Sequence, residues 1–226
     1  MISRIPLAQE PIAEADAVAQ YDKGARLYML PEYRYFVWKI RRLGIKAGRV
    51  LDIGTGSGRL AVELAKVRDN KYEITGLDIS ENMLKKAQEN AEKAGVSDKI
   101  QFIPGNADSL PFPDNYFDLV ISYASLHHWF RPGLVFKEAQ RVVKKGGAVI
   151  IRDNQRVYGN RFWEAFVRFL SLFMNRRHSE NWPKAIMASY TLSEVKAILK
   201  EAELKDFRAG TDFIKFDLCV ENNAND

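Results

Sequence analysis

The stretch Val50-Leu51-Asp52-Ile53-Gly54-Thr55-Gly56-Ser57-Gly58-Arg59-Leu60 sets the architecture of the chain. A short, mostly apolar run typical of a strand leads into three alternating glycines, and a helical pattern follows at once. Glycine adopts positive φ and has no Cβ, so the backbone can turn tightly and a bulky ligand can lie against it. The amide groups of the turn and the positive end of the next helix then face that ligand. The stretch therefore predicts a nucleotide-type crevice at the carboxyl end of a first parallel strand.

The spacing of the glycines narrows the class of ligand. Gly54, Gly56 and Gly58 read G-x-G-x-G, and Arg59 stands where a dinucleotide fingerprint places its third glycine. No Gly-Lys-Ser/Thr follows, so a Walker-type phosphate loop is absent. Structural turns also use glycine, so the segments that follow must decide whether this turn binds a ligand.

A second predicted strand, 72–78, ends in an acidic residue. Asp78 lies 20 residues after Gly58. A carboxylate at the tip of the second strand of a βαβ unit can accept hydrogen bonds from both ribose hydroxyls. The alternative is a simple turn or cap residue, but the register of Asp78 with the glycine turn favours ribose binding. Ser80 is the predicted N-cap of the next helix, and Gly95 its stop.

Three more predicted segments complete the pattern. A third strand, 99–104, precedes Asn106-Ala107-Asp108, where the Asp108 carboxylate and the Ala107 amide could read the edge of adenine. A proline-punctuated loop then delivers the chain into a fourth strand, 117–122. A turn at 144–147 leads into a strand at 148–151.

The glycine turn with Asp52 resembles the first motif of the class I S-adenosylmethionine-dependent methyltransferases, and 110–122 resembles their third and fourth motifs. The ordered motifs cover about residues 48–151, and they are most similar to the branch around quinone-biosynthesis C-methyltransferases and related small-molecule enzymes. The resemblance implies an α/β, Rossmann-like fold: a seven-stranded, mostly parallel sheet with helices on both faces and a C-terminal antiparallel hairpin. It also implies S-adenosyl-L-methionine as cofactor, S-adenosyl-L-homocysteine as product, and no metal.

The residues predicted to contact or line the cofactor follow from these motifs. They are Asp52, Gly54, Thr55, Gly56, Gly58, Asp78, Ile79, Met83, Asn106, Ala107, Asp108 and Ser122. The segment before the first motif often caps the cofactor in related enzymes, so Tyr21 and Tyr28 are candidates for touching cofactor or acceptor.

The segment that leaves the fourth strand, 122–129, contains two of the three histidines in the chain. Histidine titrates near neutrality, so it could take a proton from an acceptor. Adjacent residues point in different directions, so one histidine at most should face the cleft. His127 is the candidate base, and His128 and Trp129 are acceptor-side candidates; the alternative is that both histidines are structural. No third ligand stands at metal-binding spacing.

We expect a single domain over 1–226, divided into an N-terminal helical cap (1–45), a cofactor-binding core (46–153), a variable helical lid or acceptor region (154–190) and closing elements (191–226). The apolar run 162–174 predicts a mostly buried helix, as a lid, a homodimer contact or a wall of the acceptor pocket. The stretch 175–189 reads as an irregular connection. After a helix begun by a capping box at Thr191, strands are expected at 204–209 and 213–220, with the turn at Gly210 and a disordered tail from 221.

Composition limits the remaining classes. The net charge of +5 is spread along the chain, which argues against a nucleic-acid-binding stripe. A lone cysteine, Cys219, and the lack of a signal-like or membrane-length apolar run favour a cytoplasmic protein. The expected function is methyl transfer to a small-molecule acceptor. The rivals are a cofactor-binding regulator or partner subunit without activity and, less favoured by the glycine spacing, an NAD-dependent oxidoreductase.

Overall fold

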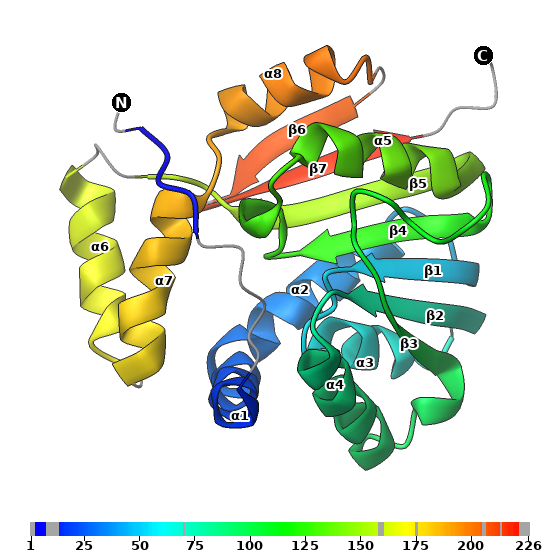
Figure 1. Ribbon diagram of the computed structural model, residues 1–226, viewed down its shortest axis with the longest axis horizontal. Helices are drawn as coiled ribbons and strands as arrows, with labels where there is room; N and C mark the ends of the chain where they lie inside the picture. The colour runs from blue at the N-terminus through cyan, green and yellow to red at the C-terminus, as the bar shows by residue number, and fades with distance from the viewer. Residues whose placement is uncertain are drawn as a thin grey trace.

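The computed structural model describes residues 3–7, 14–69, 71–157, 161–174, 176–204, 207–212 and 214–221. Its centre is a seven-stranded sheet in the order β3-β2-β1-β4-β5-β7-β6 (Figure 1). The pairs among the first five strands are parallel, and β7 runs antiparallel to both β5 and β6. The predicted fold class is confirmed. The strands are β1 (Ala47–Ile53), β2 (Lys71–Asp78), β3 (Ile100–Pro104), β4 (Phe117–Tyr123), β5 (Val143–Asn154), β6 (Phe207–Asp212) and β7 (Lys215–Glu221).

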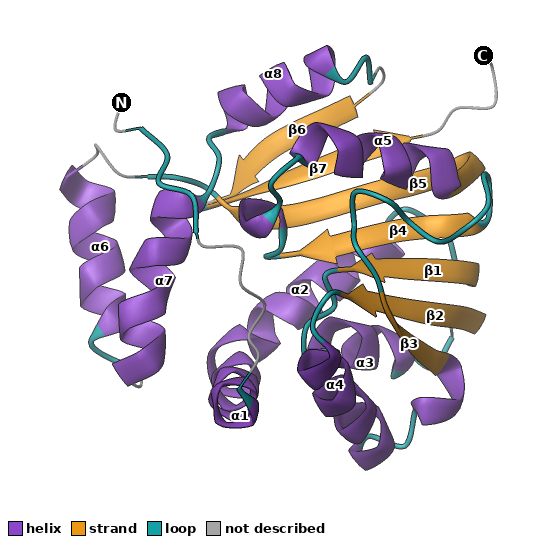
Figure 2. Cartoon of the chain, viewed as in Figure 1, coloured by secondary structure: helices purple, strands orange, loops and turns teal. Residues whose placement is uncertain are grey.

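Helices cover both faces of the sheet (Figure 2). They are α1 (Ala15–Gly24), the π-helical segment η1 (Ala25–Met29), α2 (Leu30–Arg41), α3 (Arg59–Ala65), α4 (Glu81–Lys93), α5 (Pro132–Val142), α6 (Arg161–Ser171), α7 (Arg176–Ala188) and α8 (Leu192–Glu201), with short 3-10 turns η2 (Ser97–Lys99) and η3 (Leu126–His128). The helices α5 and α8 pack on one face, and α2, α3 and α4 on the other. The pair α6–α7 stands apart, beyond the ends to which the parallel strands point (Figure 1).

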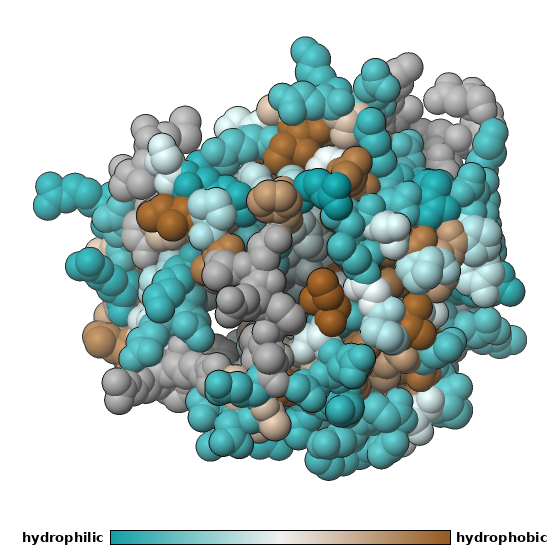
Figure 3. Space-filling model, viewed as in Figure 1, coloured by the Kyte–Doolittle hydropathy of each residue, from teal (hydrophilic) through white to brown (hydrophobic). Residues whose placement is uncertain are grey.

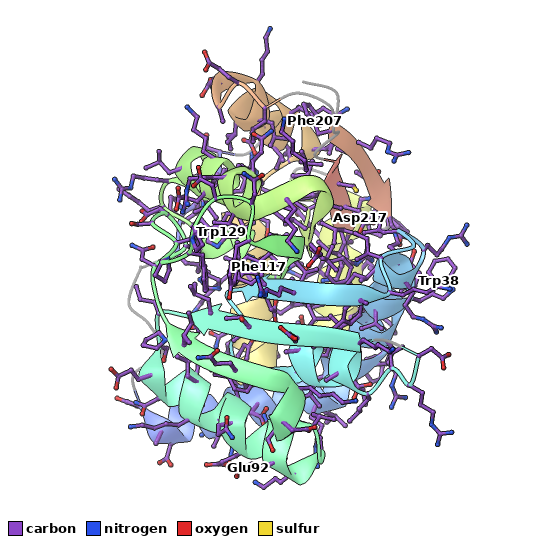
Figure 4. All side chains as sticks on the ribbon, turned by 90° about the vertical axis from the view of Figure 1, so that its right-hand side faces the viewer. Trp38, Glu92, Phe117, Trp129, Phe207 and Asp217 are labelled. Atoms are coloured by element: carbon purple, nitrogen blue, oxygen red, sulfur yellow. The ribbon has the colours of Figure 1, made fainter. Side chains whose placement is uncertain are left out.

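The central strands read as apolar runs because both of their faces are buried. In β1, Leu51 packs into the α5–α8 layer, whereas the preceding Val50 packs into the α2–α3 layer. Successive strand side chains point to opposite faces, which produces this division. Phe117, at the start of β4, is fully buried and lies in the middle of the molecule (Figure 4).

Local signals in the sequence place several helix starts correctly. The Ser80 side chain accepts a hydrogen bond from the Met83 backbone at 3.3 Å, so it caps α4 as predicted. The predicted capping box of Thr191 and Glu194 begins α8, and Pro31 lies in the first turn of α2. In each case the side chain or ring acts on the backbone of its own helix, so no tertiary contact is needed.

The region 161–188 differs from its prediction. The expected irregular connection at 175–189 is the helix α7, despite Pro183 inside it. Ile186 of α7 packs against Val167 of α6 and Val157, so tertiary contacts sustain a helix that its sequence only weakly encodes. The expected burial of 162–174 is also wrong, because four large apolar side chains are 55–79% exposed: Phe162, Phe169, Leu172 and Phe173. Hydrophobic surface shows at the left of Figure 3, over α6 and α7.

Two strand boundaries also differ. β5 begins at Val143, so the expected turn at 144–147 lies inside its bounds, with Gly146 at φ +78°. Gly210, the expected turn, pairs with Asp217 inside β6, and the pairing of the two strands continues to Asp212 and Lys215. The tail from residue 222 lies outside the described residues. Within the described ranges no helix is long and apolar enough to cross a membrane.

Candidate active site

A cleft of about 490 Å³ opens at the carboxyl ends of the parallel strands. Segments from the ends of β1, β2, β3 and β4 meet there, at the edge where an open parallel sheet binds its ligands. The predicted residues that line it are Gly54, Gly56, Asp78, Ile79, Met83, Asn106, Ala107 and Asp108, with Tyr21, His128 and Trp129 from the acceptor-side candidates. Residues far apart in the sequence are thus brought together by the topology.

The glycine turn after β1 is built by backbone hydrogen bonds. The amides of Gly54 and Thr55 both donate to the Leu77 carbonyl, at 2.8 and 3.0 Å. Gly54 has φ +69°, and a Cβ there would stand 2.0 Å from Ser125 Oγ. Gly56 has φ +55° and faces the cleft beside Tyr21. A side chain at either glycine would intrude on the turn or on the cleft, so the backbone itself forms this wall.

Asp78 at the tip of β2 is fixed by the turn it faces. Its Oδ2 accepts from the Gly56 amide at 2.8 Å, and its Oδ1 accepts from the Ser80 amide at 2.9 Å. Burial raises the pKa of the Asp78 carboxyl, and the amides of Ser80, Gly56 and Ile79 oppose that rise. A carboxylate has about four lone-pair sites, so beside these three amides Asp78 retains the capacity to accept at least one further hydrogen bond from a ligand in the cleft.

The loop after β3 and the loop after β4 meet through an ion pair. Arg131 donates two hydrogen bonds to Asp108 Oδ2, at 2.9 and 2.7 Å. Arg131 also lines the cleft, and so do Ser125, Phe130 and Val135, none of which the sequence singled out. Ser125 lies just before η3, and Phe130 and Arg131 lie just after it, where no regular periodicity indicates which side chains face the cleft. Val135 lies in α5.

Four of the predicted cofactor residues lie behind the cleft rather than along it. Thr55 Oγ1 donates to Asp52 Oδ2 at 2.6 Å, and Ser122 Oγ donates to the Ile53 carbonyl at 2.8 Å. Gly58, at φ +71°, packs against α4. The structure thus gives Asp52, Thr55, Gly58 and Ser122 supporting positions beneath the glycine turn. Tyr28 is half-buried in η1 and does not line the cleft.

The two adjacent histidines have different surroundings. His127 is 4% exposed and lies outside the cleft lining; its Nδ1 is 2.7 Å from Asp153 Oδ1. Burial alone would raise the pKa of Asp153, but the charge and hydrogen bond of His127 lower it overall. His128 lines the cleft. Although the residue is exposed overall, its ring is desolvated by neighbours, and this, with His127 beside it, lowers the pKa of His128 to about 4. The geometry favours His128 over the predicted His127 as the group that reaches the cleft.

Tyr21 enters the cleft from α1, and its neighbour Asp22 fastens that helix to the glycine turn. Arg59 donates to both Asp22 oxygens, at 2.7 and 2.6 Å. The Asn90 amide donates to Asp22 Oδ1 and to the Ser57 carbonyl, each at 2.8 Å. Burial, with the charges of Asp78 and Asp22, raises the pKa of Tyr21 to about 12, so its phenol stays neutral. The N-terminal segment is therefore tied directly to the cofactor motif.

A pH-dependent effect on stability is expected at Asp52, which is 1% exposed. Burial raises the pKa of its carboxyl from 3.8 to about 7. Above that pH the folded protein holds a buried carboxylate that the unfolded chain exposes to water, so this group lowers stability as pH rises through about 7. Asp52→Asn should raise the melting temperature at pH 8 by about 3 °C or more, corresponding to about 1 kcal/mol.

The gain from Asp52→Asn should shrink as the pH falls from 7 toward 3.8 and vanish below, where the carboxyl is neutral in both states. Thermal unfolding between pH 4 and 8, followed by circular dichroism, measures it. The exposed Asp98→Asn is the matched control. An equal difference at pH 4 and pH 8 would contradict the assignment.

The cleft fits S-adenosylmethionine on two structural grounds. The carboxylate of Asp78 is held beside the glycine turn by the Gly56 amide, so a ribose could bind the carboxylate while it lies against backbone without side chains. The wall formed by Asn106, Ala107 and Asp108 supplies amide and carboxylate groups that suit an adenine edge. Among the described residues, no group of three His, Cys, Asp or Glu side chains is arranged to hold a metal ion.

Comparison with known proteins agrees with this site. Residues 51–151 match the family described as a methyltransferase domain. The 27-O-demethylrifamycin SV methyltransferase of Amycolatopsis mediterranei is 34% identical over 164 residues, 72% of this chain and 56% of its own. A ubiquinone/menaquinone biosynthesis C-methyltransferase of Photorhabdus laumondii is 31% identical over 121 residues, 52% of this chain and 48% of its own. The chain spans about half the length of these curated relatives.

A solved structure extends the likeness to the whole fold. A candidate S-adenosyl-L-methionine-dependent methyltransferase of Methanococcus maripaludis superposes with a TM-score of 0.74 and 23% identity, covering 100% of this chain and 99% of its own. At 23% identity this similarity shows a shared fold and nothing about activity. Residues 51–151 therefore match a methyltransferase domain, and the shared fold agrees with the resemblance to the class I S-adenosylmethionine-dependent methyltransferases. The resemblance seen in the sequence motifs is confirmed.

Proposed function

We propose that this protein transfers a methyl group from S-adenosylmethionine to a small-molecule acceptor. The observation that carries the proposal is the Asp78 carboxylate, held by the Gly56 and Ser80 amides at the edge of the cleft. That arrangement suits a nucleoside with free ribose hydroxyls. An NAD-dependent oxidoreductase would share the fold but not this combination of glycine spacing and matched domain. A regulator without activity would share both, so only an assay of methyl transfer separates it from an enzyme.

The bound cofactor would supply a methyl group already activated on a sulfonium sulfur. The protein then has to hold the cofactor and the acceptor, orient them toward each other and exclude water from them. Asp78 and the glycine turn would hold the ribose, and Asn106 to Asp108 the adenine. Trp129, itself fixed by a 3.0 Å hydrogen bond from Nε1 to Ser125 Oγ, would wall the cleft against water. Alignment of the reacting groups can contribute about 7–11 kcal/mol, so a modest contribution from a base suffices.

The acceptor is proposed to be a small molecule with an apolar body. By their names, one relative methylates 27-O-demethylrifamycin SV and the other is a C-methyltransferase of ubiquinone/menaquinone biosynthesis. The cleft carries the apolar side chains of Trp129, Phe130 and Val135 beside its polar groups. The helices α6 and α7, predicted as a lid or acceptor region, stand beyond the same strand ends (Figure 1). In this proposal they border the acceptor.

Calorimetric titration tests the cofactor, and a transfer assay tests the activity. We expect micromolar binding of S-adenosylmethionine and S-adenosylhomocysteine and none of NAD. Incubation with methyl-labelled cofactor and a panel of quinols, phenols and polyketides should then label at least one product. Binding without any transfer would favour the regulator. Absence of binding to folded protein would overturn the methyltransferase proposal.

His128 is the proposed proton acceptor, because it lines the cleft and its lowered pKa keeps the ring neutral at physiological pH. His128→Gln should lower kcat about 100-fold, the ordinary contribution of a general base, while leaving the Kd for S-adenosylhomocysteine within about threefold. Steady-state kinetics and calorimetry on the same variant measure the two effects.

The pH profile distinguishes a base from a wall residue. A base works in its deprotonated form, so wild-type activity should fall as pH drops toward about 4, and the His128→Gln profile should lack that fall. In the comparison variant His127→Gln the base is kept, but the neighbour that lowers the pKa of His128 is lost. The fall in activity should therefore persist and move to higher pH. If His128→Gln retained full kcat, the proposed role would be wrong.

A further inference from the structure

A second hollow lies on the outside of the cap, between α1, α3 and α4. It has a volume of about 370 Å³. Figure 1 shows α1 and α4 as neighbours at the bottom of the molecule, and the two helices are in contact. Six cationic side chains line this groove: Lys23 and Arg26 from the N-terminal segment, Arg59 and Lys66 from α3, and Lys86 and Lys93 from α4. The one acidic residue along it is Asp22.

The cations outnumber the carboxylates that neutralise them. Asp22 is taken by Arg59, Glu63 pairs with Lys66 at 2.8 Å, and Glu89 pairs with both Lys86 and Lys93. Lys23 and Arg26 form no ion pair with any carboxylate among the described residues. Six positive charges therefore meet three negative ones, which leaves an excess of three around one concave site. Such concentrated charge raises the local concentration of anions.

Two of the groove cations are also partly buried. The side chains of Arg59 and Lys86 are 20% and 22% exposed, so their charges are screened less by solvent than those on an open surface. The nearby Asn90 amide is committed to Asp22 and the Ser57 carbonyl, so the floor of the groove is rigid. A rigid floor below a rim of longer lysines suits an anion with several charged oxygens.

We propose that this groove binds a polyvalent oxyanion of the phosphate class, with a diphosphate group as the ligand chemistry. Guanidinium groups match phosphate oxygens in a fork geometry, and lysines neutralise the remaining charge. The anion would bridge Lys23 and Arg26 of the N-terminal segment to Lys86 and Lys93 of α4. Because like charges from separate elements share the groove, a bound anion would replace repulsion between those elements with attraction.

The groove is linked to the cofactor cleft through two consecutive residues. Tyr21 lines the cleft and Asp22 lines the groove, and both belong to α1. An anion that holds α1 against α4 would also hold Tyr21 over the glycine turn, and so tighten cofactor binding. By linkage, cofactor would then tighten anion binding by the same factor. This coupling rests on the proposed cofactor site, whereas the anion site itself does not.

Titration of the full chain with inorganic pyrophosphate tests the site without any cofactor. We expect saturable binding, weakened at least tenfold in the double variant Lys23→Ala, Arg26→Ala. The matched control is Lys196→Ala, Lys200→Ala, which removes the same charge from exposed positions on α8 and should bind as the wild type does. Circular dichroism of each variant verifies its fold. Equal affinity in all three proteins, or no binding at all to pyrophosphate and vesicles, would overturn the proposal.

Two further experiments identify the source of the phosphate group and test whether anion binding is coupled to cofactor binding. Sedimentation with phosphatidic acid vesicles, against phosphatidylcholine vesicles, distinguishes a lipid headgroup from a free diphosphate; in either case binding must be lost in the Lys23, Arg26 double variant. Saturating pyrophosphate should lower the Kd for S-adenosylhomocysteine at least threefold in the wild type and leave it unchanged in the double variant. Pyrophosphate binding with unchanged cofactor affinity would overturn the coupling alone. Failure of S-adenosylhomocysteine to bind would count against the proposed function and not against the anion site.

Discussion

Replacing Asp78 with alanine should weaken S-adenosylmethionine binding at least 100-fold, with little loss of fold. The carboxylate accepts the Gly56 and Ser80 amides, so it fixes the glycine turn and is itself aimed along the cleft wall. Two hydrogen bonds from ribose hydroxyls to a charged acceptor are each worth about 1.5–3 kcal/mol, and about 3 kcal/mol already corresponds to more than 100-fold in Kd. Isothermal titration with S-adenosylhomocysteine measures the loss.

A conservative variant separates the charge of Asp78 from its shape. Asp78→Asn keeps one oxygen that can accept the Gly56 amide but loses the second acceptor and the charge, so an intermediate loss of about tenfold is expected. Asp98→Ala, an exposed carboxylate just before β3, is the control that should bind normally. If Asp78→Ala bound S-adenosylhomocysteine as tightly as the wild type while folded, the nucleoside orientation proposed for this cleft would be wrong.

The strand tips of the cleft could be predicted because topology decides their position. Once the glycine turn indicates a parallel sheet, the carboxyl ends of neighbouring strands must meet. Asp78 ends β2, and Asp108 lies in the loop that follows β3. No side-chain contact had to be known for that inference. Ser80 and Thr191 were equally accessible, because a cap depends on the first turn of its own helix.

The sequence could not show which of the two histidines, His127 or His128, faces the cleft. Both residues sit in the short turn η3, where no period fixes which side chain faces the cleft. The structure decides through Asp153 on β5, a strand that pairs with β4 and places a buried carboxylate against His127. Arg131 was missed for a similar reason, since its pairing with Asp108 joins two irregular loops.

The orientation of α6 shows a second limit. The helix is so rich in apolar residues that its composition predicted burial on most sides. One neighbouring helix, however, covers only part of its surface. In the structure Val167 and Ser171 face the protein, and Phe162 and Phe169 face outward. A sequence states how apolar a helix is, but the element packed against it decides which side is covered.

Gly58→Ala should lower the free energy of unfolding by about 3 kcal/mol or more, one of the largest effects of any single methyl group in this chain. Two costs add at this position. A residue with φ +71° is strained by about 1–2 kcal/mol when it carries a Cβ. That Cβ would also stand 2.8 Å from Ala87 Cβ and 2.9 Å from Phe102 Cζ, and overpacking of a core costs about 1–3 kcal/mol. Urea unfolding followed by circular dichroism measures the sum.

A matched glycine isolates the steric part of that loss. Gly95 has φ +67°, nearly the same backbone strain, but nothing lies within 4 Å of a Cβ built there. Gly95→Ala should therefore cost only about 1–2 kcal/mol. The difference between the two variants reports the contact of the glycine turn with α4 and β3, since Ala87 has no rotamer through which to move away. Equal losses would show that backbone strain alone requires glycine at 58. A larger loss at 58 means that the third glycine of the motif is needed for packing behind the cleft, whereas Gly54 and Gly56 form the wall that a ligand can touch.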